Sequence, residues 1–100
     1  MPTHDETAAF WRDFRLLTLA DQVRFDTKRR EFILDLLAME RDSTHRFRPG
    51  LRVKAVRGAP GLFEMTWAPD GRALFSMGHP VVEGKRHIIW HRVGSHTILP

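Results

Sequence analysis

The chain has 100 residues, no cysteine and a formal net charge of +4 at pH 7. This length suffices for one hydrophobic core but not for two, so we expect a single domain over residues 1–100. The lack of cysteine excludes disulfides and thiolate chemistry, and no apolar run approaches the roughly 18 residues that a membrane span requires. No signal peptide is visible, so we expect a cytoplasmic protein without membrane contact.

The first 45 residues are predicted to be mainly helical. Residues 8–17 fit either a short helix or an edge strand, because the segment is too short for its period to decide. Thr18 followed three residues later by Asp21 is a capping-box pattern, so a helix should begin just after Thr18. No glycine or proline interrupts this helix before Asp42. Its expected buried face comprises Leu19, Val23, Phe32, Ile33, Leu36, Leu37 and Met39.

From residue 46 onward the apolar period changes to two, which is typical of β-strands. The turn chemistry of Ala68-Pro69-Asp70-Gly71 indicates a hairpin, and strands joined by such short turns pair antiparallel. The expected fold class is therefore α+β, with N-terminal helical segments packed on a four- to five-stranded antiparallel sheet over residues 46–100. The expected strands are 51–56, 62–67, 72–77 and 87–91, with a short fifth strand at 96–99.

Charge is distributed unevenly between the two halves of the sequence. Residues 1–45 contain seven Lys/Arg against nine Asp/Glu, a net charge of −2, whereas residues 46–100 contain nine against three, a net charge of +6. A basic half favours a polyanionic partner, because each phosphate contact releases counterions. The alternative is a merely solubilising surface, and we favour nucleic acid.

The open face of the predicted sheet is where these cations would act. Strand parity places Arg52, Lys54 and Arg72 on that face, with Arg57 and Arg92 at strand ends. Cations that converge there would bind a phosphodiester backbone and stabilise a pentavalent phosphate transition state. Sequence parity leaves open whether they converge or are scattered.

The six histidines raise the question of a metal site. His87 and His91 would lie about 13 Å apart along a strand, too far to share one ion. No cysteine or paired carboxylate completes a ligand set, so we expect neither a metal nor a cofactor. A single histidine such as His96 can instead act as a general acid or base near neutral pH.

Four segments in the C-terminal half together resemble the RelE/ParE toxin superfamily. They are a basic strand at 50–54, a G-hydrophobic-aromatic-E strand at 61–65, a D-G-R-x-hydrophobic-aromatic strand at 70–75, and a hydrophobic strand ending in basic residues at 87–93. The resemblance covers roughly residues 47–99. It implies a microbial ribonuclease-like α+β fold and a cognate antitoxin that wraps the toxin.

The resemblance implies one of two activities. RelE-like members cleave mRNA in the ribosomal A site without a metal, whereas ParE-like members poison DNA gyrase and need no catalytic set. Our leading prediction is the toxin of a type II toxin–antitoxin system, a metal-independent, ribosome-dependent mRNA endonuclease that contacts DNA only indirectly, through the toxin–antitoxin complex. The alternatives are a ParE-like gyrase inhibitor and a basic RNA-binding domain without toxicity.

The resemblance also implies a set of site residues. Because the sequence has no tyrosine, a tyrosine-dependent mechanism is excluded, and His96 is expected to transfer the proton, with His91 as its substitute. Arg72 is expected to stabilise the transition state, and Arg92 to occupy the C-terminal basic position. The expected RNA-binding residues are Lys54, which matches the basic strand, Arg57, a weaker match, and Arg52, which strand parity places beside them.

Overall fold

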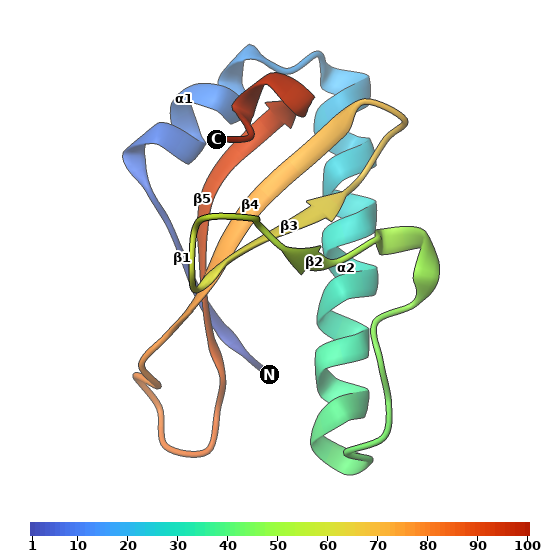
Figure 1. Cartoon of the computed structure of the whole chain (residues 1–100), viewed down its shortest axis with the longest axis vertical. Helices are drawn as coiled ribbons and strands as arrows, with labels where there is room; N and C mark the ends of the chain where they lie inside the picture. Colours follow the sequence, from blue (N-terminus) through green and yellow to red (C-terminus); the bar gives the residue numbers. More distant parts are fainter.

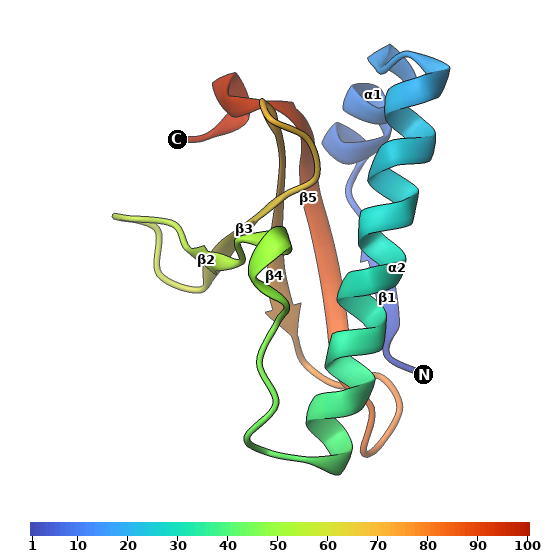
Figure 2. The same ribbon diagram turned by 90° about the vertical axis from the view of Figure 1, so that its right-hand side faces the viewer.

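The computed structural model describes all 100 residues and contains two α-helices and one five-stranded mixed sheet, so the predicted α+β class is confirmed. The sheet has the order β1-β5-β4-β3-β2, and both helices lie on one side of it (Figure 1, Figure 2). Two short 3-10 turns, η1 and η2, precede β2 and follow β5. In chain order the elements are β1 (Thr3–Glu6), α1 (Ala8–Leu16), α2 (Leu19–Arg41), η1 (Pro49–Leu51), β2 (Lys54–Ala55), β3 (Leu62–Thr66), β4 (Gly71–Gly78), β5 (His87–Ser95) and η2 (His96–Ile98).

Both α-helices begin at threonine caps. Thr18 Oγ1 accepts a hydrogen bond from the backbone N–H of Asp21 at 3.1 Å, so the predicted start of α2 is confirmed. Thr7 caps α1 in the same way by accepting from the backbone N–H of Phe10 at 3.0 Å, and the ambiguous segment is therefore a helix. As expected, α2 runs without interruption to Arg41.

The core lies between the sheet and α2 and is dominated by aromatic rings. Phe25 and Phe32 of α2 are fully buried, and their ring centroids lie 5.7 and 5.2 Å from that of Trp90 on β5. Edge-to-face pairs of this kind contribute about 0.5–1.5 kcal/mol each beyond the area they bury. The other buried hydrophobic residues are Phe10, Leu36, Leu51, Met65, Trp67, Ala73, Leu74, Phe75, Ile88 and Val93.

The buried face of α2 differs from the predicted one in its N-terminal part. Leu19 and Val23 are 75% and 59% exposed, whereas Phe25, Phe32 and Leu36 are buried. Residues 25, 32 and 36 share a helical stripe of their own, and the larger rings bury more apolar area against the sheet. The prediction was wrong there because apolar periodicity alone does not say which of two overlapping stripes meets the sheet.

The sheet is mixed because the N-terminus adds a parallel strand that the sequence did not predict. Strand β1 pairs with β5, with Thr3 opposite His87 and Glu6 opposite Trp90. Its polar residues carry no apolar alternation, and tertiary contacts hold it instead. The buried His87 ring lies 2.9 Å from Asp5 Oδ2 through Nε2 and 2.7 Å from Thr3 Oγ1 through Nδ1.

Two predicted strands are largely replaced by 3-10 turns. Within 51–56 only β2 is extended, because the chain winds into η1 and Arg52 adopts a φ of +46°. This left-handed conformation is uncommon for a residue with a Cβ. Segment 96–99 is not a strand either, since His96 begins η2. Arg52 and His96 therefore lie in turns, where strand parity does not apply.

The sheet face away from the helices is partly covered, contrary to the expectation of a free face. Leu74 and Glu64, which pair across β4 and β3, are only 4% and 7% exposed. The register between β4 and β5 shifts after Leu74, so His91 is an extra residue on β5. The His91 Nε2 atom lies 2.7 Å from Ser76 Oγ, which holds the ring against β4.

Gly71, at the start of β4, is expected to be needed for packing. A Cβ there would lie 2.5 Å from Cε2 of the buried Trp67 ring. We expect Gly71→Ala to lower the free energy of unfolding by about 1–3 kcal/mol, because this crowding forces the ring or the turn to move. Urea denaturation measures the loss. Gly50→Ala is the control, since a Cβ there meets nothing within 4 Å. Equal stability of the two variants would contradict this account.

Candidate functional site

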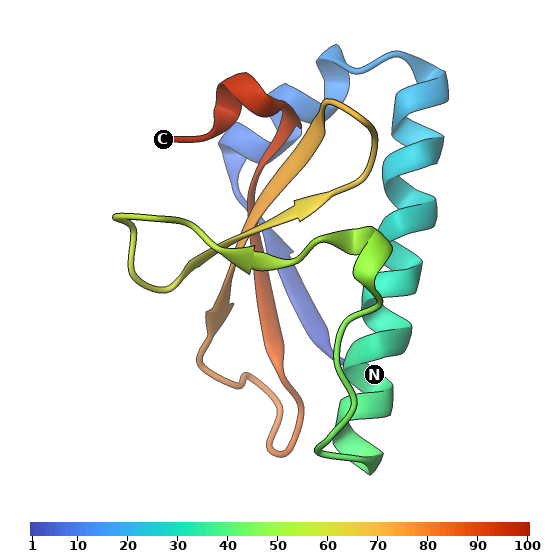
Figure 3. The ribbon, with the colours of Figure 1, turned by 45° about the vertical axis from the view of Figure 1, so that its right-hand side comes forward.

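The turn that joins β3 to β4 brings several polar side chains together. It comprises residues 68–71 and closes through a hydrogen bond from the Gly71 N–H to the Ala68 carbonyl at 3.0 Å, as the predicted hairpin requires. This turn lies at the same end of the molecule as η2 and the start of α2, opposite the β4–β5 loop (Figure 1, Figure 3).

Asp70 and His96 are joined by a hydrogen bond at this end of the sheet. His96 Nδ1 and Asp70 Oδ1 are 2.6 Å apart, and the side chains are 65% and 64% exposed. The hydrogen bond from His96 holds the pKa of Asp70 below its ordinary value of 3.8, so this carboxylate is ionised at neutral pH. An ionised carboxylate only accepts hydrogen bonds, so the ring proton sits on Nδ1 and Nε2 is free to exchange a proton.

Arg72 folds over the same turn. Its Nη1 donates to the carbonyl oxygens of Gly71, Pro69 and Ala68 at 2.9, 3.3 and 3.4 Å. Its charge also contributes to the lowered pKa of Asp70. The Nε and Nη2 groups of Arg72 have no hydrogen-bond partner in the protein, so they remain available to an anion.

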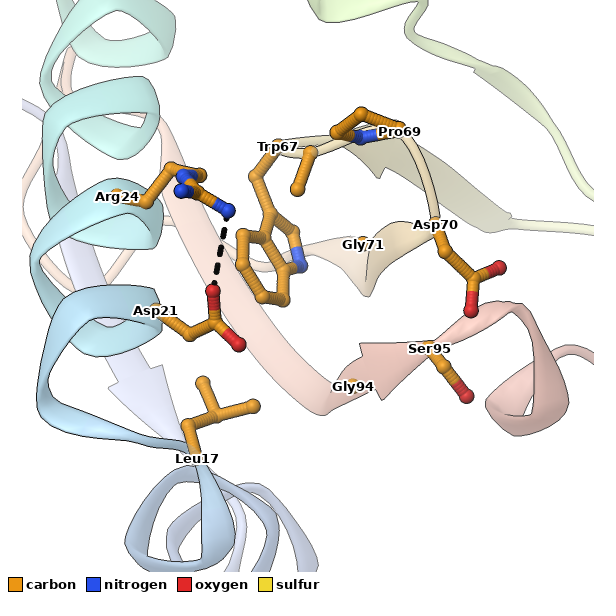
Figure 4. Close-up of a pocket in the computed structure, with 10 residues that line it drawn as sticks. Leu17, Asp21, Arg24, Trp67, Pro69, Asp70, Gly71, Gly94 and Ser95 are labelled. Atoms are coloured by element: carbon orange, nitrogen blue, oxygen red, sulfur yellow. Dashed lines mark hydrogen bonds and ion pairs between the residues drawn. The ribbon is translucent and has the colours of Figure 1, made fainter.

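A pocket of about 310 Å³ lies between this turn and the start of α2 (Figure 4). The Trp67 ring lies in its centre, between Arg24 of α2 and the turn, and the Asp70 carboxylate points towards Ser95 (Figure 4). A second cleft shares Arg24, Trp67 and two turn residues with this pocket, and its lining is basic. Asp70 therefore lines the first cavity and Arg72 lines the second, whereas His96 lines neither.

Three other predicted site residues lie in different surroundings. Arg92 Nε donates to Asp13 Oδ2 of α1 at 2.6 Å, and this hydrogen bond raises the pKa of Arg92. Lys54 Nζ lies 3.5 Å from Glu64 Oε1 on β3. Arg57 is exposed in the β2–β3 connection, which projects away from the helices (Figure 2). The predicted set is thus divided between the turn and more distant surfaces.

Sequence reasoning missed three residues of this region. Asp70 was interpreted as a turn residue and as part of the D-G-R pattern but not as a site residue, and Arg24 and Lys28 were assigned no role although both line the basic cleft. No local pattern links Asp70 to a histidine 26 positions later. The i, i+4 spacing of the two α2 cations was visible in the sequence, but it indicates a shared helix face without saying what that face meets.

The histidines serve mainly as hydrogen-bond partners of other side chains. No group of three or more His, Asp or Glu side chains is arranged so that it could hold a metal ion. The paired histidines are His4 with Glu6, His45 with Asp35, His87 with Asp5 and Thr3, His91 with Ser76, and His96 with Asp70.

No helix in the structure combines the length and the apolar character needed to cross a membrane.

Solved structures with the same fold include a bacterial toxin and two toxin–antitoxin complexes. A copper-bound mutant toxin from Helicobacter pylori matches with 21% identity over 100% of both chains and a TM-score of 0.62. The Escherichia coli DinJ–YafQ complex matches with 14% identity over 98% of this chain and 96% of that chain, with a TM-score of 0.53. The E. coli RelBE complex matches with 14% identity over 95% and 96%, with a TM-score of 0.55.

These likenesses establish the fold. No protein-family model and no curated protein sequence matches the chain. The chain nevertheless has the RelE-like toxin fold over nearly its whole length, so the fold implied by the resemblance is confirmed.

Proposed function

We propose that this protein is the toxin of a type II toxin–antitoxin pair and that it cleaves ribosome-bound mRNA without a metal ion. The observation that carries the proposal is the 2.6 Å contact between His96 Nδ1 and Asp70 Oδ1, beside Arg72, at one end of a fold shared with known toxins. This contact orients an exposed histidine and leaves its Nε2 free for proton transfer.

Each of the three side chains has a distinct task in this reaction. Cleavage begins when the RNA 2′-hydroxyl loses its proton and attacks the adjacent phosphorus, and it ends when the 5′-oxygen leaves with a proton. His96 Nε2 transfers one of these protons and solvent water transfers the other, while Asp70 holds the ring in the required orientation. Arg72 stabilises the additional negative charge on the phosphate in the transition state. The products are a 2′,3′-cyclic phosphate and a 5′-hydroxyl.

The remaining predicted residues act outside this centre. We assign Arg92 a structural role, because it is bound to Asp13, which also accepts the backbone N–H of Val93 at 3.2 Å and so ties α1 to β5. Lys54 and Arg57 are available for contacts with RNA beyond the cleaved bond. In this proposal the acid–base function belongs to His96 and not to His91, whose ring is held by Ser76.

A cognate antitoxin is part of the same proposal. The DinJ–YafQ and RelBE structures are toxin–antitoxin complexes. Residues 46–100 of this chain carry nine Lys/Arg against three Asp/Glu, so an acidic antitoxin segment would be electrostatically complementary and would exclude RNA.

Primer extension tests the proposed activity. Purified protein is incubated with message-programmed ribosomes and, separately, with the same RNA free in solution. The free-RNA sample contains EDTA, and the ribosomal sample contains the lowest magnesium concentration that keeps ribosomes intact. New 5′ ends are expected in the ribosomal sample. Intact RNA in both samples would contradict endonuclease activity and favour gyrase inhibition or simple RNA binding.

A further inference from the structure

All the charged residues that line one cleft beside the candidate site are basic. It measures about 490 Å³ and lies among α2, η1 and the β3–β4 turn. Its charged residues are Arg24 and Lys28 of α2, Arg52 after η1, and Arg72 of β4, and no carboxylate lines it. The cleft shares Arg24 and the residues 67–69 with the pocket that contains Asp70. An anion bound here would therefore lie beside Arg72, in a cleft that adjoins the pocket lined by Asp70.

The cations of this cleft are weakly neutralised by the protein. Arg52 and Arg72 form no ion pair with any carboxylate, unlike the two α2 cations, which pair with Asp21 at 3.2 Å and Glu31 at 3.3 Å. Both of those partners are on the same helix at i, i+3 spacing, and ion pairs of this partly exposed kind contribute little. A phosphate can replace these carboxylates at small cost.

The backbone at Arg52 supports a binding role for this cleft. Arg52 is the only residue other than glycine with a positive φ, +46°, and its N–H donates to the Pro49 carbonyl at 3.0 Å. Such conformations cost free energy and persist where the surroundings impose them. Here the left-handed turn ends η1 and takes Arg52 out of the line of β2, so that its side chain lines the cleft together with the α2 cations.

We propose that this cleft binds the phosphodiester backbone of the RNA substrate, so that the strand passes along α2 beside the Asp70–His96 pair. The inference rests on the proposed function, since it places the nucleotides next to the cleaved bond. It assigns phosphate contacts to Arg24 and Lys28, which strand parity could not indicate. Lys54 and Arg57, on β2 and the β2–β3 connection, contribute less to binding.

Salt-dependent RNA binding tests the cleft. The affinity of a fluorescein-labelled ten-nucleotide single-stranded RNA is measured by anisotropy between 50 and 200 mM KCl. For the Arg24→Gln/Lys28→Gln protein we expect the RNA affinity to fall by about tenfold. We also expect the slope of log K against log salt to be smaller by about 1.4, since each single-strand phosphate contact contributes about 0.7. Arg30→Gln/Arg41→Gln is the control, with the same charge change at exposed α2 positions outside the cleft.

The outcomes separate this inference from the proposed activity. Thermal melting followed by circular dichroism first verifies that both double variants fold. A loss of slope confined to the cleft variant supports the inference, and an equal loss in both variants, or in neither, overturns it. The same proteins are assayed on programmed ribosomes. If the cleft variant loses slope but the wild-type protein cuts no ribosome-bound message, only the proposed endonuclease activity is refuted. If the wild-type protein cuts message but the cleft variant keeps the wild-type slope, only the proposed role of the cleft is refuted.

Discussion

His96→Ala is expected to slow cleavage of ribosome-bound mRNA by about 10²–10⁴-fold, which is the usual contribution of a positioned acid–base group. The effect follows from the free Nε2 atom of a ring whose Nδ1 is held by Asp70 at 2.6 Å. Single-turnover rates measure it, because they isolate the chemical step from ribosome binding. His91→Ala is the matched control and should retain a rate within a few-fold of wild type. Similar losses in both variants would contradict the assignment.

Asp70 is expected to act as a positioning residue, and the pH dependence of the rate can reveal this. Its pKa lies below 3.8 because of the hydrogen bond from His96, so Asp70 stays ionised throughout the pH range in which ribosomes are assayed. Asp70→Asn removes that charge and should change the shape of the pH–rate profile, whereas a purely structural role would lower the rate equally at every pH. Circular dichroism checks that the variant keeps its fold.

Asp35→Ala is expected to lower the free energy of unfolding by about 2–3 kcal/mol. Asp35 is only 4% exposed. Its Oδ2 accepts the backbone N–H and Nε of Arg48 at 2.9 and 3.0 Å, and its Oδ1 lies 3.1 Å from Nε2 of His45. We place the loss below that of a fully buried ion pair because the Arg48 side chain is 42% exposed. Urea denaturation measures the change. Asp26→Ala, on the same helix but exposed at 42% of its side chain, is the control.

The same carboxylate should contribute to acid unfolding. Burial by itself raises the pKa of Asp35, but the hydrogen bonds from Arg48 and His45 outweigh it and lower the pKa from 3.8 to about 2. A carboxyl whose folded pKa is depressed stabilises the protein above its unfolded pKa and loses that contribution as the pH falls through its folded pKa. About 2 kcal/mol should therefore disappear between pH 3.8 and about 2 in wild type. The Asp35→Asn protein should lack this part of the pH dependence of the unfolding free energy. Identical stability–pH profiles of the variant and the wild type would refute the assignment to Asp35.

The Asp35 contacts also connect stability to the candidate site. They hold Arg48, which is the N-cap residue of η1, against the middle of α2. Because η1 leads directly to Arg52, we expect the geometry of the basic cleft to depend on this attachment. A variant that loosens it should therefore weaken RNA binding as well as lowering the stability of the fold.

The sequence by itself determined the elements whose signals are local. The Thr18 cap and an uninterrupted run of helix formers defined α2, and the Pro69-Asp70-Gly71 turn joined β3 to β4. The information for such features lies within a few residues, because a cap or a tight turn is closed by hydrogen bonds between near neighbours. The α+β class followed from the change in apolar period.

Only the tertiary structure decided which side chains meet. Asp70 is 26 residues from His96, and Arg24 belongs to a different half of the chain from Arg52 and Arg72, yet these groups lie at one end of the sheet. The polar β1 strand is likewise specified by its partner β5 rather than by its own pattern. The physical reason is that hydrogen bonds and charges act over a few ångströms in space, whereas sequence periodicity reports only how each segment divides its own residues between core and solvent.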